Sequence, residues 1–142
     1  MDSNLDKGPA PLVTNIESLT LENTNYRTTL WTGEHLQVTL MCIEPGHDIG
    51  LEVHPDIDQF LRIEQGQAAV QMGPTAEDLQ TWQAGADYAV VVPAGTWHNV
   101  VNIGDSDLKV YSLYSPAEHA PGTVHKTKAE ADEAEAAEHG VA

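Results

Sequence analysis

The sequence predicts an all-β domain, built as a sandwich or a barrel. From residue 24 onward, short apolar or alternating runs follow one another, and clusters of Gly, Pro and Asp separate them. That pattern is typical of strands joined by tight turns. No run before residue 126 shows the period of an amphipathic helix. With 142 residues, the chain has the length of one domain and can bury a core.

The start of the chain differs from the predicted strands. Residues 1–11 are polar and rich in Gly and Pro, so we expect a flexible arm. Residues 12–21 carry apolar side chains without clean alternation, and we expect a short strand that pairs with a partner subunit. Residues 24–33 predict the next strand. Within it, Arg27 either lines a pocket and binds an anionic substrate or pairs with a surface carboxylate, and the surface interpretation is favoured.

The clearest half-buried strand spans residues 36–43. Leu36, Val38, Leu40 and Cys42 alternate with the other residues, which predicts that these four face the core. Cys42 is expected to pack as a small hydrophobic residue, because a metal-ligand role would need other ligands that the neighbouring sequence lacks.

The stretch from Gly46 to Gly66 predicts two strands joined by a tight Pro-Asp turn. Glu52 and His54 are two apart in the first strand, so their side chains share one face. In the second strand Gln59 has the parity of the apolar residues and Asp58 has the opposite parity. We therefore expect Gln59 to point inward, toward the carboxylate and the imidazole, and Asp58 to point outward.

The middle of the chain continues this pattern of strands and turns. Residues 69–72 extend the second strand, residues 73–78 predict a polar loop, and residues 79–83 predict a short strand. Residues 88–92 form a nearly continuous apolar run, which favours a strand in the centre of a sheet.

Two further strands are predicted before the tail. Residues 93–102 read PAGTWHNVVN, in which a Pro-x-Gly turn precedes His98 and a strand begins at that histidine. Residues 103–107 predict a turn, and residues 108–114 predict the last clear strand.

The tail, residues 119–142, is acidic and rich in Ala and Glu. Thr127 and Glu130 have the spacing of a capping box, and Gly140 suits a helix end. The segment lacks an apolar stripe, so we expect either a short solvated helix or a disordered tail. We do not expect a metal-binding role for its histidines, which are His119, His125 and His139. A returning tail could nevertheless bring His125 over the mouth of a pocket.

The stretch from Gly46 to Gly66 resembles the first conserved motif of the cupin superfamily. That motif opens on a glycine, carries a His-x-His pair and then a glutamate, and closes on a glycine. Gly46, His54 and Gly66 match it in register, while Glu52 stands at the first histidine position and Gln59 at the glutamate position.

The second cupin motif ends in Pro-x-Gly-x-x-His-x-x-x-Asn. Pro93, Gly95, His98 and Asn102 match it without a gap. The resemblance covers roughly residues 30–115. It implies a double-stranded β-helix, or jelly roll, within a cupin domain that we place at residues 12–118. It implies little about the reaction, because one fold supports many chemistries.

The resemblance carries four residues of this chain onto the cupin metal-ligand positions, namely Glu52, His54, Gln59 and His98. Two imidazoles, one carboxylate and one amide suit a divalent transition metal such as Mn, Fe, Ni or Zn. Because an uncharged amide is a poorer ligand than a carboxylate, an empty polar pocket is the alternative.

Three functions are open for such a site. A metal acting as a Lewis acid would support isomerase or lyase chemistry on a small carbonyl- or hydroxyl-bearing molecule, of the sugar-acid type. A redox metal would support a dioxygenase, and a small-molecule-binding or sensor protein would need no turnover. The sequence leaves open whether the protein is an enzyme, and no catalytic residue is assigned. Glu44, His47 and Tyr111 are candidate acids or bases, but each is better explained by a structural position.

Composition limits the partners. The formal net charge is −16, which argues against binding to nucleic acid or to an anionic membrane surface. No apolar run approaches the length that spans a membrane. The single cysteine and the absence of a visible secretory signal favour the cytoplasm. The cupin resemblance also implies a homodimer, which the apolar residues of segment 12–21 would suit.

Overall fold

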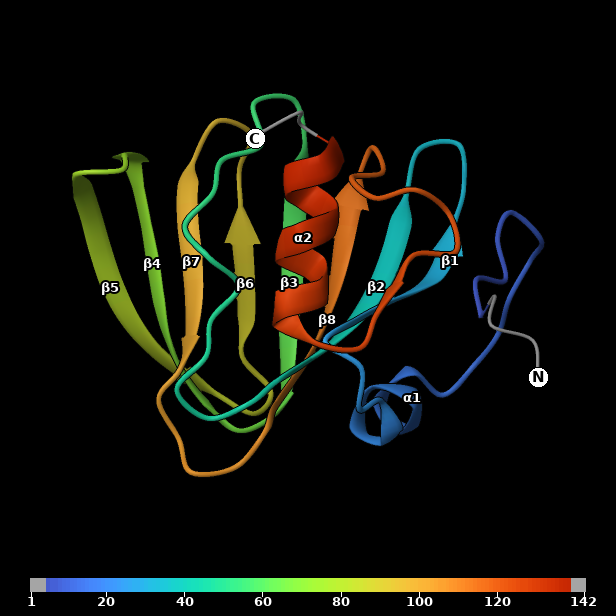
Figure 1. Ribbon diagram of the computed structural model, residues 1–142, viewed down its shortest axis with the longest axis horizontal. Coiled ribbons are helices and arrows are strands. Elements are labelled where there is room, and N and C mark those ends of the chain that lie inside the picture. The colour runs from blue at the N-terminus through green and yellow to red at the C-terminus, as the bar shows by residue number, and fades with distance from the viewer. Residues whose placement is uncertain (1–4, 139–142) are drawn as a thin grey trace.

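Two antiparallel β-sheets face each other in a computed structural model that describes residues 5–138 (Figure 1). The arrangement confirms the predicted all-β jelly roll. The strands are β1 (Arg27–Thr32), β2 (Gln37–Ile43), β3 (Asp58–Gln65), β4 (Gln67–Thr75), β5 (Asp78–Gly85), β6 (Ala89–Val92), β7 (Trp97–Asn102), β8 (Leu108–Ser115) and β9 (Val124–His125). The helices are α1 (Ile16–Glu22) and α2 (Lys128–Glu138).

The larger sheet has the strand order β6-β3-β8-β2-β1-β9, and the smaller sheet has the order β5-β4-β7. Side chains from both sheets meet in one hydrophobic core. As predicted, Leu61 and Ile63 of β3 are buried, because they alternate inward along the strand. Val70 and Val100 reach the same core from the smaller sheet.

The predicted inward face of β2 is only half confirmed, because Leu40 and Cys42 are buried but lie outside the main core cluster. The residues of β2 that join the core are Met41 and Ile43, which have the opposite parity to Leu36 and Val38. Both faces of the strand are covered, which explains the error. Leu36 and Val38 instead line an apolar groove together with Ile16 of α1.

Residues 12–21 do not form the predicted strand. Helix α1 begins after Asn15, whose side-chain oxygen accepts a hydrogen bond from the Ser18 amide at 3.0 Å. Asparagine at this position satisfies one of the free amides of the first turn. The helix has only seven residues, too few to show a helical period in the sequence.

The first half of the predicted hairpin is also wrong. Between Gly46 and the turn at residues 55–56, the chain makes only isolated bridges to β7. Gly46 and Gly50 have φ values of 80° and 90°, a conformation that interrupts an extended strand. One of the bridges pairs Glu52 with His98, so the backbone brings the two cupin-like motifs together.

Strand β6 lies at an edge of the larger sheet and not in its centre. Its apolar residues alternate between buried and exposed, and Val91 is 61% exposed. In the smaller sheet, β4 extends through Thr75. The predicted loop at residues 73–78 is therefore mostly strand.

The tail forms helix α2, which begins as the capping-box spacing predicts. The Glu130 amide donates a hydrogen bond to Oγ1 of Thr127 at 3.1 Å. The helix is not fully solvated, because Ala131 is buried in the core. An alanine is small enough to let the helix approach the sheet. A single buried alanine does not form an apolar stripe, so the sequence pattern does not predict this contact. Gly140 and His139 lie outside the described residues.

The N-terminal segment contacts the larger sheet. The Asp6 carboxylate accepts hydrogen bonds from the backbone amides of Gly8, Thr32 and Gly122, and from the Thr32 hydroxyl. Burial raises the pKa of Asp6, but these donors outweigh it and hold the pKa below its usual range. Neither helix in the described part of the chain is long and apolar enough to cross a membrane.

Candidate metal centre

Three predicted ligands meet at one end of the space between the sheets. Glu52 and His54 come from the extended loop before β3, and His98 is the second residue of β7. Nε2 of His54 lies 3.2 Å from the Glu52 carboxylate, and Nε2 of His98 lies 3.5 Å from the same oxygen. One ligand atom from each of the three residues lies within 4.8 Å of the others.

The two imidazole rings are oriented by hydrogen bonds on their outer nitrogens. Nδ1 of His98 donates to the Thr96 carbonyl at 3.0 Å, and Nδ1 of His54 lies 2.9 Å from the Glu118 carboxylate. A proton held on Nδ1 leaves the lone pair of Nε2 available. Metal-binding histidines usually have such a partner for the second nitrogen.

His98 is the most deeply buried of the three clustered side chains. Its side chain is fully buried, and its Nε2 atom makes no hydrogen bond to any described residue. A buried polar atom without a partner is costly, and a bound cation would remove that cost.

The acids and imidazoles of the centre shift one another's pKa values. Burial raises the pKa of Glu52, but its contacts with the imidazoles of His54 and His98 prevail and lower it to about 2. Burial lowers the pKa of His54, but Glu118 and Glu52 raise it to about 9. Glu52 is therefore ionised at neutral pH, and a cation that binds here replaces a proton on His54.

Gln59 lies in β3 and is 3% exposed, with the predicted inward parity, whereas Asp58 is exposed. The side-chain oxygen Oε1 of Gln59 is buried and accepts no hydrogen bond within the described chain. A buried amide oxygen without a hydrogen bond has its lone pairs available to coordinate a cation. Its assignment as the fourth metal ligand stays a prediction.

The donor set fits a divalent transition metal. Once His54 has released its proton, two imidazole nitrogens and one carboxylate suit first-row metals, and the absence of a cysteine among the three residues disfavours a structural zinc site. Three or four protein ligands leave coordination positions for water or substrate.

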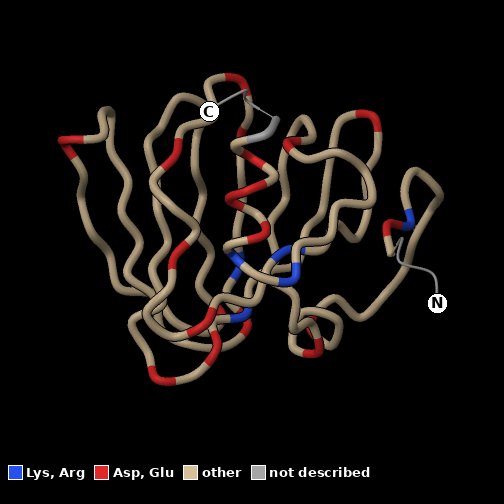
Figure 2. The backbone as a smooth tube through the Cα atoms, viewed as in Figure 1, with Lys and Arg blue, Asp and Glu red and all other residues tan. Residues whose placement is uncertain are grey.

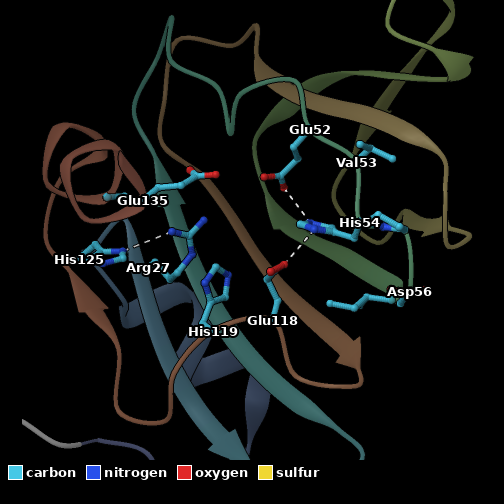
Figure 3. A pocket seen from close by; sticks show the side chains of 12 residues that line it. Arg27, Glu52, Val53, His54, Asp56, Glu118, His119, His125 and Glu135 are labelled. Atoms are coloured by element: carbon cyan, nitrogen blue, oxygen red, sulfur yellow. Dashed lines mark hydrogen bonds and ion pairs between the residues drawn. The ribbon is translucent and has the colours of Figure 1, made fainter. Parts of the chain in front are cut away.

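Glu52 and His54 also line a cavity of about 290 Å³ (Figure 3). Its other walls come from β1, β9, helix α2 and the segment after β8, through Arg27, His125, Glu135, Glu118 and His119. Burial lowers the pKa of His119 to about 3, and Arg27 adds to this effect. His119 is therefore neutral at physiological pH, and its buried Nε2 atom makes no hydrogen bond to residues 5–138.

The sequence did not indicate that Glu118 and His119 belong to this site. They come after the last large strand, and Gln37 of β2 fixes their backbone. Oε1 of Gln37 accepts hydrogen bonds from the amides of Glu118 and His119, and its Nε2 atom donates to the His119 carbonyl. Gln37 is fully buried. A buried glutamine with three backbone contacts is a strong constraint, but it cannot be distinguished from a surface glutamine in the sequence.

Other candidate residues lie elsewhere. Glu44 and His47 line a separate hollow beside Cys42. Arg27 does line the cavity at the metal centre, which supports the less favoured of its two predicted positions.

Comparisons with known proteins agree on the fold. A sequence model of the family described as "Cupin domain" matches residues 39–114. The uncharacterized protein YrkC of Bacillus subtilis is 55% identical over 139 residues, covering 94% of this chain and 74% of that protein. The crystal structure of BH2720 from Bacillus halodurans has a TM-score of 0.90 at 55% identity, covering 91% of this chain and 98% of that one. KdgF from Halomonas has a TM-score of 0.58 at 22% identity, covering 65% and 78%.

Proposed function

Because the chain belongs to the cupin family, we propose that Glu52, His54, His98 and Gln59 bind one divalent transition metal in its jelly roll. The observation that carries this proposal is the convergence of two oriented imidazoles on one carboxylate, with Nε2 of His98 buried and 3.5 Å from that carboxylate, too far for a good hydrogen bond. The geometry favours a metal centre over an empty polar pocket, because an empty pocket would leave that nitrogen without a partner.

We propose that the centre acts on a small molecule that carries a carbonyl or a hydroxyl group. When bound, the metal would polarise that oxygen as a Lewis acid. The residues of the chain prepare the site for this role. Glu118 fixes the ring of His54, and His119 presents a neutral imidazole to the cavity. Such a site would support isomerase or lyase chemistry.

Metal loading tests the proposal on the unmodified protein. The protein is stripped with a chelator, loaded separately with Mn²⁺, Fe²⁺, Ni²⁺ or Zn²⁺, desalted and subjected to elemental analysis. We expect close to one metal per chain for at least one ion, and a higher melting temperature in excess metal. Binding at a hundred times the Kd stabilises a protein by about 2.7 kcal/mol. Failure to retain or be stabilised by any of the four ions would contradict the metal centre.

We also propose a homodimer that forms through the apolar groove beside α1. Val13 is wholly exposed on the rim of this groove, whose other walls include Leu30, Trp31 and Leu36. A projecting apolar side chain beside an apolar groove suits a two-fold contact, in which each copy inserts Val13 into the other.

Light scattering at micromolar concentration should give twice the chain mass of 15.4 kDa. Val13→Asp should give the mass of a single chain, because a charge would enter the apolar contact. Val91→Asp, an equally drastic change at the exposed edge of β6, should leave the dimer intact. A monomer mass for the unmodified protein refutes the dimer, and dissociation by both variants refutes this interface.

A further inference from the structure

Arg27 places a cation in the wall of the cavity at the metal centre. It is the first residue of β1 and pairs with His125 of β9, and both side chains line the cavity. Figure 3 shows Arg27 across the pocket from Glu52 and His54. The cavity therefore has a cation on one side and the candidate metal ligands on the other.

The guanidinium of Arg27 has no carboxylate partner within the described residues. It contacts Nδ1 of His125 at 3.3 Å and lies over the ring of Tyr26 at 5.3 Å. Its Nε atom is buried and donates no hydrogen bond in the described part of the chain. The chain contains 22 acidic residues and only 6 lysines and arginines, and Figure 2 shows how widely the acids are spread. An arginine without an acidic partner is therefore unexpected in this protein.

The carboxylates nearest to the metal centre have other partners. Glu118 lies 2.9 Å from Nδ1 of His54, and Glu52 lies between the two imidazoles. Glu135 of α2 lines the cavity but is exposed and forms no ion pair with Arg27. Asp56 is the remaining acid of the lining, and no carboxylate of the cavity wall forms an ion pair with Arg27 among the described residues.

We propose that this cavity binds a small carboxylate whose carboxylate group lies on Arg27 and whose hydroxyl or carbonyl oxygen faces Glu52, His54 and His98. The planar guanidinium offers paired donors that match the two oxygens of a carboxylate. The unpaired Nε2 atom of His119 adds a further polar group at the cavity wall. The inference about the oxygen end rests on the proposed metal centre, whereas the carboxylate end depends on Arg27 alone.

A carboxylate fits the cavity better than a phosphate does. No lysine is among the lining residues, and Arg27 is their only arginine. The wall that α2 contributes includes Glu135, close to the carboxyl end of the helix, where the helix dipole is negative. These groups oppose a dianion more strongly than a monoanion. The volume of about 290 Å³ limits the ligand to a small molecule.

Calorimetric titration of the Mn²⁺-loaded protein with lactate tests the inference, with lactamide as the neutral probe of the same shape and inorganic phosphate as the dianion. Lactate should bind, and both lactamide and phosphate should bind more weakly. Arg27→Gln should weaken lactate binding about 10- to 100-fold, the range for loss of a charge-assisted hydrogen bond. Arg27→Lys should restore part of the affinity. Glu135→Gln removes an acid from the same cavity and should strengthen lactate binding.

The metal content and melting temperature of every sample separate this inference from the proposed metal centre. Lactate affinity that is unchanged in a folded Arg27→Gln protein overturns the carboxylate site, whatever the metal content. Equal binding of lactamide, or tighter binding of phosphate, overturns it as well. If the samples hold no metal but lactate still binds in an Arg27-dependent way, the metal centre fails and the carboxylate site stands.

Discussion

Replacing His98 with alanine is expected to abolish stoichiometric metal binding. The change removes one of two imidazole ligands, at a side chain that is fully buried. Loss of a residue that merely orients a ligand typically costs 10–100-fold in metal affinity, so loss of the ligand itself should cost more than about 100-fold. Elemental analysis after loading and desalting should fall from close to one metal per chain to near zero.

The same change leaves a cavity in the core, so stability must be measured separately. Truncation of a large buried side chain costs about 2–5 kcal/mol. Glu52→Gln is the matched variant, because it preserves the shape of a partly exposed side chain and removes only the carboxylate. It should also lose metal while remaining folded. His47→Ala removes an exposed histidine that lies outside the metal cluster and should retain full metal content. Full retention by both His98→Ala and Glu52→Gln would place the metal elsewhere.

Replacing Gln59 with glutamate is expected to have opposite effects with and without metal. Without metal, the variant buries an additional carboxyl group at a position that is 3% exposed. Burial raises the pKa of such a group by several units, which should cost about 2–4 kcal/mol of stability at neutral pH. With metal, a full negative charge replaces an amide dipole at the ion, so the metal affinity should rise by roughly tenfold or more.

Thermal unfolding and metal titration of the same sample measure both effects. The melting temperature of the metal-free variant should fall, and the increase on adding metal should exceed that of the unmodified protein. Gln83→Glu, which adds the same charge to an exposed position of β5, should produce neither effect. A variant that is destabilised but has unchanged or weaker metal affinity would show that Gln59 is not a ligand.

The sequence allowed prediction of the fold, and of the meeting of Glu52, His54 and His98, because both depend on local patterns. Strands β2, β3, β7 and β8 alternate or begin at turn residues, and the two cupin-like motifs name the ligand positions. The bridge between Glu52 and His98 then confirms that the two motifs meet.

The errors arose where neighbours in space decide the structure. A seven-residue helix is too short for its period to be recognised in α1. The apolar run of β6 gives no sign that one of its faces is exposed at a sheet edge. Glu118 and His119, which line the cavity, lie far from Gln37 in the sequence, although the buried Gln37 side chain holds their backbone in place. A sequence pattern cannot report such a contact, because the partners lie about eighty residues apart.

The hydrogen bonds of Asp6 connect the start of the chain with the wall of the cavity. Its carboxylate joins the end of β1 to the amide of Gly122, in the short segment between His119 and His125. Ordering of the segment around Asp6 is therefore energetically coupled to ordering of residues 119–125, which carry His119 and His125 in the cavity wall. Thermodynamic reciprocity requires that whatever stabilises one also stabilises the other. Asp6 is in this sense a remote part of the candidate binding site.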